Sequence, residues 1–309
     1  MKLALFQRVL CAFALLLAFG LRAAETFTVA TYNVENYLDK AIGTRTAKTE
    51  AAKAKIREGI RALNPDVLAL QEMGTTNALL ELRASLKAEG LDFPHWEHVR
   101  GFDTNIFVAV LSRFPIVARR PHTNENYLLN GRRLYVSRGF AEVDIKVGAD
   151  YTFTLITAHL KSKRPVPVAS EADMREQEAL RLREIISARL AANPRANLVV
   201  LGDFNDTRDS KPIKTLLGGR GADGLVDTRP AERNGDNLPN PVPYYSPRNI
   251  TWTYYYGVKD TYERIDYIFI SKPMAREWNK DGTFALTLAN WGAGSDHRPI
   301  AASFFRVDK

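Results

Sequence analysis

Cysteine is almost absent from this 309-residue sequence, since the only one is Cys11. A single cysteine cannot close a disulfide within the chain, so the sequence excludes the small disulfide-stapled folds. Stability must therefore come from a hydrophobic core, and a chain of this length can bury a large one. Hydrophobic residues at 45% and charged residues at 25% are typical of a globular protein.

Acidic residues are absent from the first 24 positions. Lys2 and Arg8 precede an uncharged apolar run over 9–21, and small residues follow it. This layout is typical of a secretory signal peptide, and the run is too short to span a bilayer as a permanent helix. We therefore predict a signal peptide over 1–24 and an exported mature domain over 25–309, in the periplasm or the medium. A retained membrane anchor is the alternative.

Internal repeats, low-complexity tracts and linkers are also absent, which predicts one domain after the signal peptide. The formal charge of +8 includes three basic residues of that peptide, so the mature chain carries about +5 (8 minus 3). This modest surplus suits a polyanionic partner without requiring one. We expect no stable membrane association, we infer no protein partner, and we expect a monomer.

Apolar periodicity predicts alternating strands and helices. Strands are expected over 27–33, 66–70, 106–112, 134–147, 151–159, 198–201, 264–271 and 300–305, and helices over 48–63, 77–89 and 171–191. The last helix is expected to bury Leu182, Ile185, Ile186 and Leu190 and to turn its charges outward. The stretch over 218–249 is rich in Gly, Asn and Pro, which predicts a long surface loop.

Several predicted strands end in polar residues, and this pattern indicates a shared site at one edge of a sheet. The clearest case is the buried run before Gly202, after which Asp203 and Asn205 are expected to project to one side. A turn built on Asx residues is the alternative for that segment. The other such strand ends carry Asn33, Glu72 and His159.

Asp266 lies inside an apolar strand, so its carboxylate needs a partner if it is buried. His297 is the expected partner, because a carboxylate on one ring nitrogen orients the imidazole and lets the other accept a proton from water. Its neighbour Asp296 is expected to face away, toward a cation shared with Glu72. Oxygen ligands without thiolates or a histidine cluster favour Mg²⁺, with Mn²⁺ or Ca²⁺ as alternatives to it. Each residue also has an ordinary structural interpretation, as a cap or as a paired core group.

Six short segments together resemble the endonuclease/exonuclease/phosphatase superfamily of metal-dependent phosphodiesterases, and they occur in the order expected of it. They are Thr31-Tyr32-Asn33-Val34, Leu70-Gln71-Glu72, Thr157-Ala158-His159-Leu160, Gly202-Asp203-Phe204-Asn205, Arg264-Ile265-Asp266-Tyr267 and Ser295-Asp296-His297-Arg298-Pro299. The resemblance covers nearly the whole mature chain. It implies an α/β (α+β) fold, a four-layer αββα sandwich of two packed mixed β-sheets flanked by helices. It also implies hydrolysis of phosphate esters with a divalent metal.

The resemblance also implies roles by position. Glu72 corresponds to the main metal ligand, with Asn33 and Asp296 nearby. Catalytic roles fall to His159, Asp203, Asn205, Asp266 and His297. Arg138, Asn205 and Lys161 are the expected substrate-binding residues, and Asp103 is expected to support His159. Whether His159 or Asp203 protonates the leaving group stays open.

The substrate is predicted to be nucleic acid, either DNA or RNA. Whether the protein would act on it as an endonuclease or as an exonuclease stays open. Basic residues support this, because they can hold a phosphate backbone; they are Arg119, Arg120, Arg132, Arg133, Arg138, Lys161, Lys163 and Arg164. Aromatic residues over 252–256, with Tyr244 and Tyr245, can stack on bases or pack in a sheet. The alternatives are a lipid or small-molecule phosphoesterase, sphingomyelinase-like or phosphatase-like, and a catalytically silent secreted binding protein.

Overall fold

The computed structural model describes residues 25–233 and 250–306. The predicted signal peptide and Tyr244-Tyr245 lie outside the described residues, so the predictions made for them stay predictions. No helix within the described ranges is both long and apolar enough to cross a membrane.

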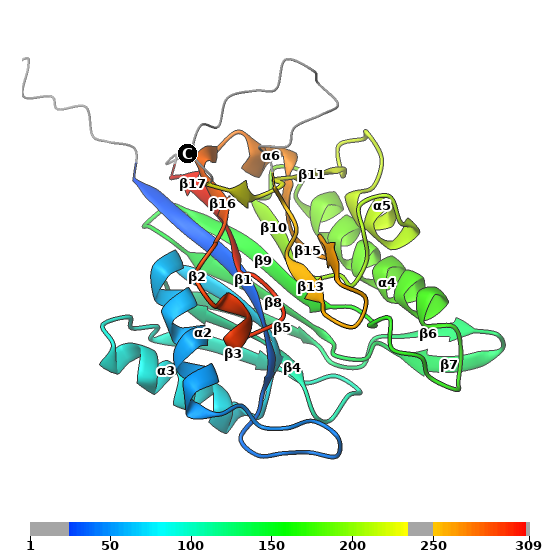
Figure 1. The fold of residues 1–309 in the computed structure, drawn as a ribbon. Helices are drawn as coiled ribbons and strands as arrows, with labels where there is room; N and C mark the ends of the chain where they lie inside the picture. Colours follow the sequence, from blue (N-terminus) through cyan, green and yellow to red (C-terminus); the bar gives the residue numbers. More distant parts are fainter. Residues whose placement is uncertain (1–24, 234–249, 307–309) are drawn as a thin grey trace, which may run out of the picture.

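Two β-sheets pack face to face in the described residues (Figure 1). The first sheet has seven strands, in the spatial order β12 (Ala231–Glu232), β16 (Trp278–Ala285), β17 (Ile300–Phe305), β1 (Thr26–Tyr37), β2 (Val67–Met73), β4 (Phe107–Ser112) and β3 (His95–Val99). The second sheet has six strands, in the order β11 (Leu225–Asp227), β15 (Asp266–Ser271), β10 (Leu198–Asp203), β9 (Thr152–His159), β8 (Phe140–Lys146) and β5 (Ile116–His122). Both sheets mix parallel and antiparallel pairs.

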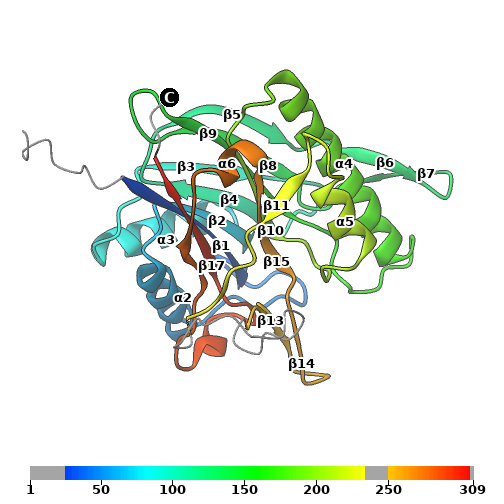
Figure 2. The same ribbon diagram turned by 90° about the horizontal axis from the view of Figure 1, so that it is seen from above.

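Helices cover the outer face of each sheet, and two hairpins extend from the body (Figure 2). The outer elements are α2 (Glu50–Leu63) and α3 (Thr76–Ala88) on the first sheet, and α4 (Glu171–Ala192) and α5 (Lys211–Leu217) on the second. Two short helical elements are α6 (Lys272–Ala275) and η1 (Trp291–Ala293). One hairpin pairs β6 (Asn126–Leu129) with β7 (Arg132–Tyr135), and the other pairs β13 (Tyr254–Tyr256) with β14 (Thr261–Glu263).

The apolar residues form three clusters that match these layers. One lies between the two sheets and includes Phe27, Val29 and Leu201. A second joins the first sheet to α2 and α3, and a third joins the second sheet to α4 and α5. The central strands of the two sheets are therefore apolar on both faces, which explains the uninterrupted apolar runs in the sequence. The predicted four-layer αββα sandwich is confirmed.

Several local predictions were wrong or incomplete. The strand expected over 134–147 is broken at Gly139, which has a left-handed φ of +66°. The expected loop over 218–249 contains β11 and β12 in its described part. In α4, Ile185 is only partly buried, and two charged residues, Arg175 and Glu178, face inward. Strands β3, β5 and β16 were not predicted, because polar residues interrupt their apolar pattern.

Candidate active site

Three polar residues lie on one rung of the second sheet. The parallel pairing of β9 with β10 sets His159 beside Asp203, and the antiparallel pairing of β10 with β15 sets Asp203 beside Asp266. All three are at most 2% exposed. Hydrogen-bonding register alone therefore brings together residues from three distant parts of the sequence.

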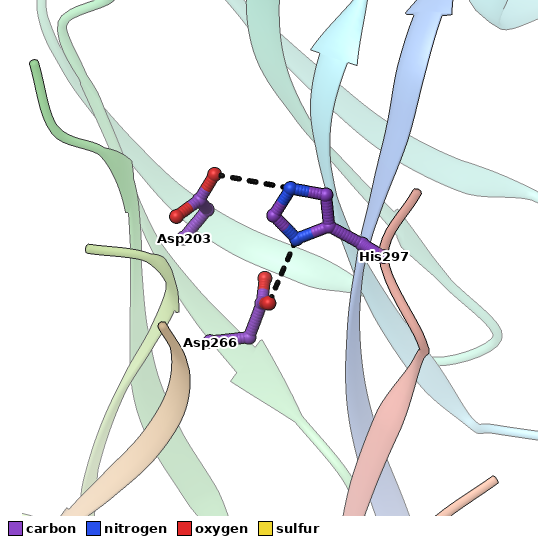
Figure 3. A group of neighbouring side chains, drawn as sticks. All are labelled: Asp203, Asp266 and His297. Atoms are coloured by element: carbon purple, nitrogen blue, oxygen red, sulfur yellow. Dashed lines mark hydrogen bonds and ion pairs between the residues drawn. The ribbon is translucent and has the colours of Figure 1, made fainter. Parts of the chain in front are cut away.

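His297 completes this group from the segment before β17 (Figure 3). Its Nδ1 lies 2.8 Å from Oδ2 of Asp266, which confirms the predicted pairing. Its Nε2 faces Oδ2 of Asp203 at 3.8 Å. Because Asp266 accepts the Nδ1 proton, the neutral ring keeps its lone pair on Nε2, where it can take a proton from water.

Two hydroxyl groups hold this pair in place. Thr253 accepts hydrogen bonds at Oγ1 from the backbone amides of Ile265 and Asp266, at 3.2 and 3.1 Å. Ser295 accepts at Oγ from the amide of His297 and donates to the carbonyl of Asn33, at 3.0 and 2.7 Å. The imidazole is thereby fixed to both sheets rather than carried on a free loop.

Burial and neighbouring charges shift the pKa values of His297 and Asp203. Burial lowers the pKa of His297, but the charges of Asp266 and Asp203 outweigh it and hold that pKa well above its ordinary value. Burial raises the pKa of Asp203 to about 7, although His297 opposes the shift. Groups with perturbed acidity in mutual contact are typical of catalytic sites.

His159 differs from His297, since burial and the nearby charge of Arg138 hold the pKa of its imidazole well below the ordinary value. Its Nε2 lies 3.4 Å from Asp203, and its Nδ1 is buried without a hydrogen-bond partner among the described residues. The expectation that Asp103 supports His159 is therefore wrong. Asp103 instead lies 3.7 Å from Nε of Arg138, because the loop before β4 packs on the segment that follows β7.

The turn after β10 differs from the extended segment that was expected. β10 ends at Asp203, and Asn205 has a left-handed φ of +54°. The amide of Asn205 donates to Oδ1 of Asp203 at 2.9 Å, which is the Asx turn considered as the alternative. Gly202 is required here, because a Cβ would lie 2.0 Å from the carbonyl oxygen of Ala158.

Glu72 and Asn33 reach the site from the first sheet. The ladder of β1 and β2 shifts register after Asn33, and Glu72 has a left-handed φ of +59°, so bulges redirect the side chains there. Asn33 donates from Nδ2 to Oδ2 of Asp203 at 3.0 Å and accepts at Oδ1 from the amide of Glu35. Asn33 therefore orients Asp203, and its role as a metal ligand stays a prediction.

Asp296 lies nearer to the histidine than predicted, because the chain bends at this residue instead of running extended. Its Oδ1 is 3.9 Å from Nε2 of His297. Burial raises the pKa of Asp296 to about 6, and the charges of Glu35 and Glu72 add to the rise. These carboxylates repel one another, and an oxygen-lined site of this kind suits a hard divalent cation.

Asp203, Asp266 and His297 have ligand atoms that all lie within 4.8 Å of one another. Its geometry can hold a metal ion, but Nδ1 of His297 and Oδ2 of Asp266 are already bonded to each other. That bond favours a proton-transfer role for the pair, and the roles of Glu72 and Asp296 as metal ligands stay predictions.

Sequence reasoning missed Arg45. Its guanidinium donates from one Nη to Oδ1 of Asn36 at 2.5 Å and lies 3.7 Å from Oε2 of Glu72. Arg45 belongs to the segment between β1 and α2, which has neither an apolar period nor a motif that would have identified it. The positive charge of Arg45 therefore lies close to Glu72, a candidate metal ligand.

Lys161 and Arg138 are buried, and their charges act on His159. The ammonium group of Lys161 donates to the carbonyls of Ser162 and Arg164, at 2.9 and 2.7 Å, and Arg138 donates to the carbonyl of Leu160 at 3.2 Å. Their substrate-binding roles stay predictions.

Glu178 of α4, another residue that sequence reasoning missed, supports this region. Its carboxylate accepts hydrogen bonds from both the amide and the hydroxyl of Ser137 and from the amide of Lys161.

Comparison with known proteins agrees with this fold. The structure is similar to truncated TDP2 of Caenorhabditis elegans, with a TM-score of 0.60 and 17% identity over 91% of this chain and 98% of that one. It is also similar to the 3′ phosphatase NExo from Neisseria bound to product DNA hairpin, with a TM-score of 0.58 and 17% identity over 90% and 99%. A third similar structure is beta toxin from Staphylococcus aureus, with a TM-score of 0.60 and 18% identity over 89% of this chain and 99% of that one. No curated protein sequence matches.

Residues 30–297 match the model of the endonuclease/exonuclease/phosphatase family, a range that includes every residue of the site described above. The chain belongs to this family of phosphoester hydrolases.

Proposed function

We propose that the protein is an exported, monomeric phosphodiesterase that hydrolyses nucleic acid with a divalent cation, most favourably Mg²⁺. The observation that carries the proposal is the buried pair of His297 and Asp266, whose free nitrogen Nε2 faces the carboxylate of Asp203. An imidazole braced by a carboxylate is a general base, and a phosphodiester needs such a base to activate water.

In this reaction His297 accepts the proton of the attacking water at Nε2, while Asp266 stabilises the imidazolium through Nδ1. Asp203 is suited to protonate the leaving oxygen, because a pKa of about 7 leaves much of it protonated at neutral pH. Asn33 and Asn205 fix the two oxygens of Asp203. Glu72 and Asp296 would hold the cation, which neutralises the charge of the phosphate when bound.

Aromatic residues beside the site support nucleic acid as the substrate. The ring of Tyr254 lies 4.8 Å from the ring of His297, and Tyr256 stacks on Tyr254 at 6.3 Å with an interplanar angle of 21°. Tyr256 is 38% exposed, and an exposed ring of this kind can stack on a base. Two neighbours in fold, NExo and TDP2 of zebrafish (D. rerio), are described with a bound DNA product.

One observation favours a sphingomyelinase-like alternative. The β13–β14 hairpin exposes Val258 at 81% and Tyr262 at 55%, and an apolar hairpin of this kind can enter a membrane surface. Beta toxin shares the fold. The two functions differ in substrate, so one panel of assays separates them.

The test is to incubate the purified mature protein with plasmid, single-stranded RNA, sphingomyelin vesicles and a phosphomonoester. Each is tried with Mg²⁺, Mn²⁺, Ca²⁺ or a chelator. We expect metal-dependent cleavage of nucleic acid. His297→Ala and Glu72→Ala should each abolish it with an unchanged circular dichroism spectrum.

Glu184→Ala, which removes an exposed carboxylate of α4, is the matched control and should retain activity. Release of phosphocholine alone would support the alternative. Full activity in either site variant would refute the assignment.

A further inference from the structure

An exposed pair of stacked rings lies on the two segments that carry Asp103 and Arg138, and the charge of Arg138 acts on His159. Phe102 and Tyr135 have ring centroids 5.2 Å apart and an interplanar angle of 8°. Phe102 is 68% exposed and Tyr135 is 39% exposed. A phenyl ring that stays mostly in water contributes little to folding, so this pair calls for another explanation.

The pair stands on a fixed support next to Arg138. The amide of Asp103 donates to the carbonyl of Ser137 at 2.6 Å, which ties the loop of Phe102 to the segment after Tyr135. Gly101 permits this approach, because a Cβ there would lie 2.3 Å from the carbonyl carbon of Arg138. The rings are therefore held in place within a few residues of the guanidinium group that adjoins His159.

Tyr135 belongs to the β6–β7 hairpin, which extends from the body as an arm in both views (Figures 1 and 2). The arm carries Arg132 and Arg133, both exposed. Arg133 donates to Asn126, and neither arginine has an acidic partner among the residues that the structure describes. Arg119 and Arg120, by contrast, are paired with acids on β3 and β8 and are poor candidates for phosphate contacts.

We infer that Phe102, Tyr135, Arg132 and Arg133 form an accessory subsite for an unpaired stretch of nucleic acid on one side of the scissile phosphate. This inference rests on the proposed function. In a duplex, neighbouring bases cover each base face, whereas an unpaired strand offers free faces to aromatic rings. The rings of Tyr254 and Tyr256 lie next to His297 on the β13–β14 hairpin and offer a second stacking platform.

The test compares hydrolysis of a single-stranded 12-mer, the same sequence as a duplex, and bis(4-nitrophenyl) phosphate. Replacing both rings, Phe102→Leu with Tyr135→Leu, should raise the KM for the single strand about tenfold or more, as expected when base stacking is removed. The small ester does not reach the arm, so its kcat/KM should fall far less. Phe102→Tyr with Tyr135→Phe keeps both rings and should keep the KM.

Val117→Ala, which shortens an exposed side chain of β5, is the control for a surface change elsewhere. In a His297→Ala background, fluorescence anisotropy of the labelled 12-mer reports binding without cleavage. The double change Arg132→Gln with Arg133→Gln should reduce the slope of log K against log salt by about 0.7 for each phosphate that these arginines neutralise.

An unchanged KM after removal of both rings would overturn the subsite, as would an equal decrease in activity on the small ester. A wild-type preference for the duplex would overturn the assignment to unpaired strands. If the wild-type protein cleaves no nucleic acid in any metal, the proposed function fails and this inference fails with it. Cleavage of nucleic acid with no effect of the ring variants overturns this inference alone.

Discussion

The bond between Asp266 and His297 gives the sharpest test of the proposed chemistry, through the change Asp266→Asn. The native carboxylate is 2% exposed and accepts from Nδ1 of His297 at 2.8 Å. An asparagine can instead donate its amide to Nδ1. That favours the tautomer with the proton on Nε2, where the ring can no longer act as a base.

The expected decrease in rate follows from the role assigned to the imidazole. General acid–base catalysis contributes about 10² to 10⁴ in rate, and the variant should lose most of that factor in kcat. A decrease of about 10³ corresponds to about 4 kcal/mol in the activation free energy. The charge that Asp266→Asn removes is also the main one that raises the pKa of His297.

The sign of the pH effect is therefore fixed. In the wild-type protein His297 acts when it is deprotonated and Asp203 acts when it is protonated, so kcat/KM should pass through a maximum as the pH rises. The charge of Asp266 raises the pKa of both groups, so in the variant both limbs of the profile should move to lower pH while the maximum drops.

The assay is a pH profile of kcat/KM on a labelled oligonucleotide, with circular dichroism and thermal unfolding as checks on the fold. Asp92→Asn, at an exposed surface residue paired with Lys87, is the matched control and should leave the profile unchanged. A variant with wild-type kcat, or a rising limb that moves to higher pH, would refute the assignment of His297 as the base.

Two further predictions concern stability and metal binding. Glu178→Ala removes the acceptor of three hydrogen bonds, one buried and two partly buried, so it should lower the free energy of unfolding by about 3 to 5 kcal/mol in urea titration. Glu178→Gln keeps one acceptor and should cost less, and equal effects of the two variants would contradict this. Arg45→Ala removes a cation 3.7 Å from Glu72, so Mn²⁺ should bind about fivefold more tightly by calorimetry, equivalent to about 1 kcal/mol. Arg208→Ala serves as the control, and weaker metal binding in Arg45→Ala would contradict the argument.

Local errors in the prediction have particular causes. The buried run of β10 was found because four aliphatic residues on a strand have few other interpretations, whereas β5 was missed because Arg119 and Arg120 interrupt its pattern. Glu178 was expected to point to solvent, since helical periodicity does not reveal that a second chain segment supplies donors to a carboxylate. Arg45 was missed because its contact with Glu72 joins two segments that are separate in the sequence, and no local pattern marks it.

The sequence by itself predicted the alternation of strands and helices, because apolar periodicity depends only on neighbouring residues. The sandwich fold and the roles of the site residues were predicted from the resemblance of six short motifs to a known family. The sequence also predicted the pairing of His297 with Asp266, since a buried carboxylate needs a partner. Only the tertiary structure decided the rest. Strand register placed His159, Asp203 and Asp266 on one rung, and the bend at Asp296 brought that carboxylate within 3.9 Å of His297. These arrangements depend on contacts between segments far apart in the chain, which no local pattern encodes.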